Sequence, residues 1–255
     1  MPPTEILNGS YDPWAVALSI VIAVAGAWAS LDLAERVTAA KGRARTAWLV
    51  GGVIATSIGI WSTHYTAMLA FRLPVPTQYD WPTAINSLTS AFAASLAALL
   101  AVTQPTLGRR QAIIGTVIMS LAISALHYIA MGSMRAPVLH HYAITLVALS
   151  IALAAAFSFM SLTLMFFFRA GHKRPRKRVA AALLLGAAIS LMHFTGLAAV
   201  TYTRSDVVPN LSHAVSLPAG GIVTIGSLAL VVLGAVVVAS MFERRRHSPR
   251  QGWLG

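Results

Sequence analysis

The sequence predicts an all-α fold, a polytopic membrane bundle of seven transmembrane helices, from its composition, its apolar segments and the placement of its charges. Of its 255 residues, 57% are hydrophobic and 10% are charged, and the mean hydropathy is +0.72. Soluble domains carry roughly a quarter charged residues, so these values are typical of a protein embedded in a bilayer. Seven apolar segments reach the roughly 20 residues that a membrane helix needs. They lie near residues 13–34, 47–71, 82–103, 111–133, 141–168, 179–202 and 218–242.

Three regions follow from these segments. Residues 1–12 form an outer N-terminal segment, residues 13–242 form the membrane domain, and residues 243–255 form a short basic cytoplasmic tail. No Lys or Arg precedes the first apolar segment, so we expect it to be a retained helix and not a cleaved signal peptide. The chain contains no cysteine, which excludes disulfides and thiolate metal ligands.

The basic residues predict the orientation of the helices. Sixteen of the nineteen Lys and Arg residues lie in the tail and in the connections 35–46, 104–110 and 169–178, which all fall on one side of the membrane. The other three connections hold one arginine each. By the positive-inside rule, the N-terminus is outside and the C-terminus inside. Topology thus accounts for the formal charge of +12, and we expect no nucleic-acid partner.

Three related stretches, residues 61–68, 125–131 and 191–197, each place a histidine inside an apolar segment. His64, His127 and His193 lie 63 and 66 residues apart, which indicates a repeated two-helix unit. Each lies roughly 12–16 Å below the outer charged boundary, on helices that run in the same direction. An intramembrane imidazole is costly unless it is paired or used, although a single one usually only packs. Three at one depth predict a shared site.

The residues around the histidines favour copper. Met68 and Met131 follow a histidine by four residues, and Met192 directly precedes one, so we expect them as soft additional ligands. Thioethers suit Cu(I), whereas a zinc site of three histidines and water would leave the methionines without a role. Ser124 and Ser190, three residues before a histidine, are expected to fix ring tautomers. Small residues one turn away from the histidines allow close helix approach.

These stretches resemble the three repeats of the bacterial MHYT domain. The resemblance is carried by His64-Tyr65-Thr66, His127-Tyr128 and Met192-His193-Phe194-Thr195, and it spans roughly residues 10–245. It implies an integral protein of the bacterial cytoplasmic (inner) membrane. It also implies a copper-binding sensor of a diatomic gas (O2, CO or NO) or of redox state.

The match to the motif is uneven. Thr63 and Leu126 stand where the motif has methionine, Ile129 replaces threonine, and Phe194 replaces tyrosine. Histidine alone occurs in all three copies, so the resemblance assigns the site chiefly to the histidines. Tyrosines in such positions either cap the site or anchor the helix at the membrane interface.

Several functional alternatives remain open at this stage. Two histidines on facing helices can ligate haem b, which would make the chain an electron-transfer or haem-handling protein. A copper transporter or metallochaperone is a third reading, but the inner halves of the histidine-bearing segments look mostly apolar. No Ser-His-Asp set, nucleotide loop or carboxylate pair is present, so we expect no enzyme.

Further expectations concern partners and peripheral residues. Besides the lipid bilayer, we expect a separate signalling or membrane protein as partner, because no output domain is recognised; self-association into a homo-oligomer is left open. His140, His141 and His213 are expected to be solvated histidines in outer loops. Asp32 and Arg36, four residues apart at the inner end of the first helix, are expected to form an ion pair.

Overall fold

The computed structural model describes residues 5–169, 175–216 and 219–247. Its helices are α1 (Pro13–Ala39), α2 (Gly42–Ala70), α3 (Trp81–Val102), α4 (Arg109–Met131), α5 (Ile144–Phe168), α6 (Pro175–Ala198) and α7 (Ala219–His247). Among the described residues, α1 to α6 are each long and apolar enough to cross a membrane, and α7 adds the apolar stretch Val223–Val236. The predicted all-α bundle of seven helices is confirmed.

Some predicted features fall outside the described residues. They are residues 1–4 of the expected outer segment, Lys173 and Arg174 of the basic connection, and residues 248–255 of the expected tail.

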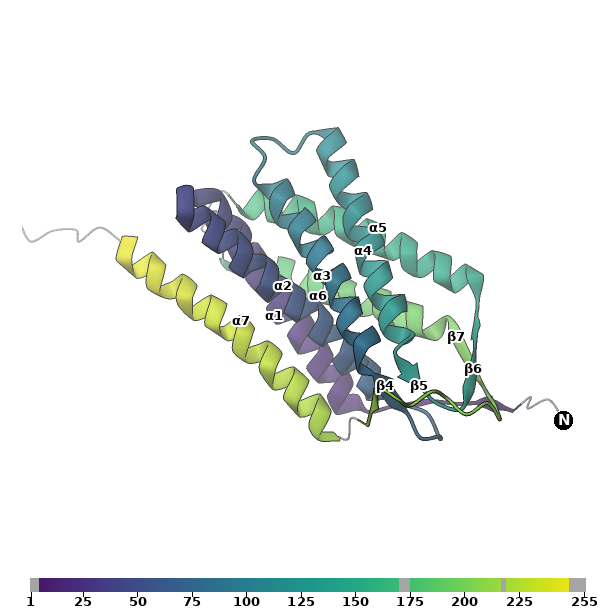
Figure 1. Ribbon diagram of the computed structural model, residues 1–255. Coiled ribbons are helices and arrows are strands. Elements are labelled where there is room, and N and C mark those ends of the chain that lie inside the picture. Colours follow the sequence, from purple (N-terminus) through teal and green to yellow (C-terminus); the bar gives the residue numbers. More distant parts are fainter. Residues whose placement is uncertain (1–4, 170–174, 217–218, 248–255) are drawn as a thin grey trace, which may run out of the picture.

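Short strands, which were not predicted, lie together at one end of the bundle (Figure 1). They are β1 (Ile6–Leu7), β2 (Ser10–Tyr11), β3 (Phe71–Arg72), β4 (Gln78–Asp80), β5 (Met134–Arg135), β6 (Val138–Tyr142), β7 (Val200–Arg204) and β8 (Ala214–Val215). They form three small antiparallel sheets, β1–β7–β6, β2–β3 and β5–β4–β8. We call this end of the bundle the strand end and the opposite end the basic end.

The β6–β7 pair corrects two predicted helix limits. The segment predicted over 141–168 begins its helix at Ile144, and the one predicted over 179–202 ends its helix at Ala198. Residues 138–142, before the first helix, pair with residues 200–204, after the second. The two predicted segments extended into these strands, and the β-branched residues of β7 favour a strand.

Helices α1 to α6 close into a ring, because each packs against the next and α6 packs back on α1. Each pair of helices forms one repeat, and each repeat is closed by its own strand pair. β2–β3 joins the start of α1 to the end of α2, β4–β5 does the same for α3 and α4, and β6–β7 for α5 and α6. Three similar two-helix units thus surround one axis. Helix α7 lies outside the ring on one flank, against α1 and α2 (Figure 1).

Charged residues fix the strand end of two repeats. Asp12 caps α1 and Asp80 caps α3, and each accepts hydrogen bonds from amides in the first turn at 3.0–3.2 Å. Each carboxylate also pairs with an arginine just beyond the second helix of its repeat. Arg72 lies 2.6 Å from Asp12, and Arg135 lies 3.7 Å from Asp80. In the third repeat Ala143 occupies the cap position and provides no side-chain acceptor.

At the basic end, a buried ion-pair network ties α1 to α6. Arg36 Nε lies 2.8 Å from Asp32 Oδ2, which confirms the predicted pair. Arg178, from the first turn of α6, extends it by contacting Asp32 Oδ1 at 3.3 Å and Glu35 Oε2 at 2.6 Å. Desolvated charges are tolerated only when paired, so this network holds the two helices in one register.

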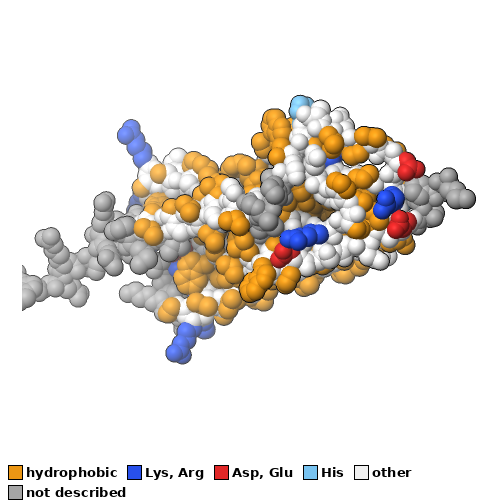
Figure 2. All heavy atoms as spheres, turned by 90° about the horizontal axis from the view of Figure 1, so that it is seen from below, with side chains coloured by type: hydrophobic (Ala, Val, Ile, Leu, Met, Phe, Trp, Pro, Cys, Tyr) orange, Lys and Arg blue, Asp and Glu red, His pale blue; other side chains and the backbone are white. Residues whose placement is uncertain are grey.

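The flanks of the bundle are apolar. Figure 2 shows hydrophobic side chains along the visible face and most charged side chains toward its two ends. Lys41, which precedes α2, and Arg43 and Arg45, in the first turn of α2, are exposed at the basic end. The molecule therefore has the apolar girdle that a bilayer requires.

Candidate metal centre

His64 on α2, His127 on α4 and His193 on α6 meet on the axis of the helix ring. Their side chains are buried, with exposed fractions of 4%, 0% and 3%. One ring nitrogen of each lies within 4.8 Å of the corresponding nitrogens of the other two. The closest pair is Nδ1 of His64 and Nδ1 of His193, at 3.1 Å. Among the described residues, this is the one group of three or more His, Asp or Glu side chains close enough together to hold a metal ion.

The three rings have nearly equivalent positions. Their centroids are 5.1, 4.7 and 5.1 Å apart, and the ring planes meet at 88°, 84° and 82°. Each histidine stands seven residues, about two helical turns, before the first residue of the strand that closes its repeat. The repeated unit therefore sets each ring at the same height on its helix, and the closed ring of helices turns all three toward the axis.

Most ring nitrogens of this cluster lack a hydrogen-bond partner. Apart from the Nδ1–Nδ1 contact, Nε2 of His64, Nε2 of His193 and both nitrogens of His127 are buried without a partner among the described residues. A neutral imidazole carries one donor and one acceptor. Leaving a buried polar group unsatisfied costs about 1–3 kcal/mol. The cluster is thus suited to a bound species that accepts nitrogen lone pairs.

An aromatic side chain follows each histidine and meets it edge-on. The ring centroids of Tyr65, Tyr128 and Phe194 lie 5.5, 4.8 and 5.1 Å from those of the preceding histidines. The hydroxyl of Tyr65 is 3.2 Å from that of Ser133, and the hydroxyl of Tyr128 is 2.7 Å from that of Ser150. Tyr65 is buried, so it caps the site and does not anchor its helix at the interface.

The three predicted methionine ligands lie on two sides of the rings. Met68 and Met131 are fully buried in an apolar cluster at the strand end that includes Leu197 and Tyr79. Met192 lines a cavity on the side facing the basic end. Their participation in ligation stays a prediction.

Neither of the two serines that were predicted to fix a histidine ring bonds to one. The hydroxyl of Ser190 donates to the carbonyl oxygen of Gly186, 3.0 Å away on its own helix, so the prediction that it fixes a histidine ring is wrong. The Ser124 hydroxyl is buried without a partner among the described residues and holds no ring either. A helix offers a serine its own carbonyl one turn back, and that contact competes with the histidine.

The prediction of solvated loop histidines is confirmed for His213 and only in part for the other two. His140 and His141 lie in β6, where His141 is exposed and its Nε2 is 3.0 Å from the Thr203 hydroxyl. The His140 ring packs against Tyr202 at a centroid distance of 5.2 Å, and burial, followed by the charge of His141, lowers the pKa of His140. His213 is exposed beside Trp81. None of these outer histidines belongs to the cluster of His64, His127 and His193.

The fold and this cluster define a polytopic membrane protein with a candidate metal centre made by three helical repeats. A family model described as "Bacterial signalling protein N terminal repeat" (MHYT) matches residues 3–50, 58–115 and 121–182. The chain belongs to this family. His64 and His127 lie within the matched residues, whereas His193 lies beyond them and is placed at the site by the structure.

Curated relatives are longer signalling proteins. Over 198 residues the chain is 38% identical to the "Bifunctional diguanylate cyclase/cyclic di-GMP phosphodiesterase MucR" of Pseudomonas aeruginosa, covering 77% of the chain and 29% of the relative. It is 33% identical to the "Cyclic di-GMP phosphodiesterase NbdA" of the same organism (94% and 31%) and 31% identical to the "Signaling protein YkoW" of Bacillus subtilis (81% and 26%). The chain thus spans less than a third of each of these relatives. No solved structure is significantly similar to it.

Proposed function

We propose that this protein is a membrane sensor that binds a copper ion through His64, His127 and His193 and responds to a diatomic gas (O2, CO or NO) or to redox state. The observation that carries the proposal is the cluster itself, three buried imidazoles with four of their six nitrogens unpartnered in the described structure. Burying a polar imidazole inside the membrane is unfavourable unless its nitrogens have a partner. An ion on the axis would give each of the three rings such a partner.

The donor set fits a single small ion. Metal–nitrogen bonds near 2.0–2.1 Å place the ring nitrogens of a trigonal site about 3–4 Å apart. The nitrogens already lie within 4.8 Å of one another, and one pair is at 3.1 Å. Small rotations of the three side chains would complete the site. Imidazole with thioether nearby favours copper over hard cations, which take oxygen ligands.

The three imidazoles would hold the copper ion, and the bound ion would supply the chemistry that binds a diatomic molecule. The chain's own residues would set which side is accessible, because Tyr65, Met68 and Met131 fill the strand-end side. Met192 borders the opposite side.

Signalling is supported by the family and by the names of the similar proteins. We place the strand end outside and the basic end inside a bacterial cytoplasmic membrane, because the exposed cations of the connections gather at the basic end. The response then leaves through a partner signalling protein at the basic end. Sensing, and not catalysis, is the role assigned to this chain.

Haem ligation is the main alternative. A bis-histidine haem needs its macrocycle between two imidazoles, whereas these ring centroids are only 4.7–5.1 Å apart. A copper transporter or metallochaperone would share the histidines, so it is distinguished by net movement of copper into vesicles.

Metal analysis of protein purified without a polyhistidine tag tests the proposal. We expect copper in the wild type and its loss in the variant His64→Ala, His127→Ala, His193→Ala. The matched control replaces three histidines outside the cluster, His140→Ala, His141→Ala, His213→Ala, and should retain copper. Equal copper in the two triple variants would refute the site. A Soret band that is lost only with the first variant would establish haem instead.

A further inference from the structure

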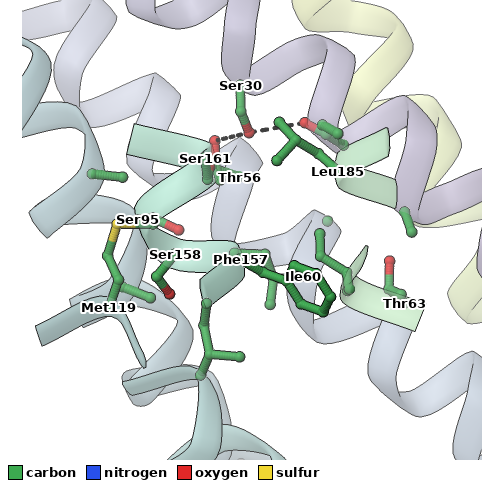
Figure 3. A pocket seen from close by; sticks show the side chains of 18 of the residues that line it. Ser30, Thr56, Ile60, Thr63, Ser95, Met119, Phe157, Ser158, Ser161 and Leu185 are labelled. Atoms are coloured by element: carbon green, nitrogen blue, oxygen red, sulfur yellow. Dashed lines mark hydrogen bonds between the residues drawn. The ribbon is translucent and has the colours of Figure 1, made fainter. Parts of the chain in front are cut away.

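A cavity of about 80 Å³ lies directly beneath the histidine cluster, on its basic-end side. All six helices of the ring contribute to its wall, and α7 does not. Ile60, Ile123 and Ile189 line it, and each stands four residues before one of the histidines on the same helix face, so the cavity lies about one helical turn below the rings. Its wall continues toward the basic end, where Met165 and Leu99 line it near the ends of α5 and α3, and Figure 3 shows ten of its lining residues by name.

The wall limits what the cavity can hold. None of the residues that line it in the described structure is charged, and most are aliphatic or small. A buried charge without a partner is strongly unfavourable, so an ion or a charged metabolite is excluded. An engineered cavity that binds benzene measures about 150 Å³, roughly twice this volume. The cavity therefore fits an uncharged molecule of a few atoms.

Hydroxyl groups supply weak polar contacts within this apolar space. The Ser30 hydroxyl donates to the Gly26 carbonyl oxygen at 2.8 Å and lies 3.4 Å from the Thr56 hydroxyl, so both hydroxyls have partners (Figure 3). The hydroxyls of Ser95 on α3 and Ser158 on α5 line the cavity, have exposed fractions of 1%, and lack partners among the described residues. These two donors can hydrogen-bond a small ligand, and hydrogen-bond donors of this kind influence dioxygen binding in other metal pockets.

The two sides of the histidine cluster differ in access. On the strand-end side, Tyr65, Met68, Met131 and Leu197 have exposed fractions of 0–2% and pack into one apolar cluster beneath the strands. On the other side, the cavity lies about one helical turn from the rings. The free volume that the described structure has near the cluster is therefore on its mid-membrane side.

We propose that this cavity is a binding site for a small, uncharged, lipid-soluble molecule of the size of dioxygen or nitric oxide, and that it delivers the molecule to the histidine cluster from the mid-membrane side. Such molecules concentrate in apolar surroundings, so the bilayer is their source. What the molecule does at the cluster rests on the proposed function, but its presence in the cavity does not.

Xenon is the probe for the site, because it enters dry apolar cavities and requires no metal. In ¹²⁹Xe NMR of the metal-free protein in detergent, we expect a bound xenon signal in the wild type. We expect its loss in Ala154→Phe, which places a ring in the cavity. Ser95→Leu, a smaller filling change in another helix, should also abolish the signal and guards against misfolding of the first variant.

Two further arms complete the test. Leu149→Phe adds a ring of the same size to the exposed face of α5 and should retain the xenon signal. Ser95→Ala with Ser158→Ala should retain or strengthen it, since the cavity becomes more apolar. A wild type that excludes xenon because water fills the cavity would overturn the inference, as would equal xenon signals in the filled and control variants.

Kinetics on copper-loaded protein separate this inference from the proposed function. We expect nitric oxide to associate with the wild type and Leu149→Phe at the same rate, and more slowly with Ala154→Phe at unchanged copper content. Absence of copper would refute the metal centre and leave the xenon result standing. Equal association rates for filled and unfilled proteins would refute delivery through the cavity.

Discussion

Gly196 on α6 lies against the imidazole of His127 on α4. A β-carbon added at Gly196 would stand 2.4 Å from Nε2 of His127, closer than any packed methyl group is found. The equivalent positions of the other repeats hold Ala67 and Ala130, three residues after their histidines. The third repeat thus has glycine where its backbone approaches a neighbouring ring, and the absence of a side chain at Gly196 leaves the space that the His127 ring occupies.

The substitution Gly196→Ala is therefore expected to displace the His127 ring and weaken copper binding, by roughly 10- to 100-fold as for other changes around metal ligands. Competition with a Cu(I) chelator measures this. Gly51→Ala is the control, because a β-carbon there meets nothing within 4 Å. It should leave affinity unchanged and, by favouring helix, leave stability equal or slightly higher. Equal affinities of the two variants would contradict the role of Gly196.

The methionines separate by their positions. Met192→Leu is expected to lower Cu(I) affinity more than Met68→Leu or Met131→Leu, because only Met192 lines the free volume near the rings. Leucine conserves volume closely, so each change should cost less than about 1.5 kcal/mol of stability. Cu(I) affinity and thermal unfolding are measured together. A uniform loss of affinity across the three variants would show that packing, and not thioether ligation, is responsible.

The network at the basic end is expected to dominate stability. Asp32→Asn removes the shared carboxylate and leaves Arg36 and Arg178 buried without it, which should cost about 3–5 kcal/mol. Unfolding in mixed micelles with increasing SDS measures the loss. The exposed Asp206→Asn is the control and should change stability by less than about 0.5 kcal/mol. A similarly small effect of Asp32→Asn would mean that the network is not stabilising.

His140 is expected to make the strand end sensitive to acid. Burial lowers the pKa of His140 in the folded protein below the ordinary value of about 6.5, so the unfolded chain takes up the proton first. The contribution of neutral His140 is complete above that pH and declines as the pH falls below it. Wild type should therefore lose more thermal stability between pH 7.5 and 5.5 than His140→Phe.

The variant His140→Phe keeps a ring against Tyr202 but cannot titrate. His213→Phe, at an exposed position, is the control and should follow the wild type across the same pH interval. If His140→Phe loses as much stability on acidification as the wild type, other groups account for the acid response.

Sequence patterns predict the helices and the common depth of the histidines, but they do not predict the short strands that close each repeat. Apolar length predicts each helix, and the spacing of His64, His127 and His193 predicts their common depth, because both depend on local periodicity. The strands escape prediction because they are only two to five residues long, too short to show a period-two pattern. The pair Asp32–Arg36 is predictable from a four-residue spacing, whereas Arg178 joins it from 146 residues away. The sequence shows that Gly196 is a small residue near a histidine. It does not show the contact with His127, which depends on how α4 and α6 pack.

Helix α7 breaks the three-fold arrangement of the repeats. The three histidines belong to three equivalent repeats, so an ion on the axis would draw on all of them alike, whereas α7 packs mainly on α1 and α2. Leu233 of α7 contacts the position of Gly59, five residues before His64. A widening or tightening of the cluster would therefore reach α7 mainly through the first repeat. A symmetric movement of the three histidines would then displace α7 in one direction, because α7 lies on one flank of the ring.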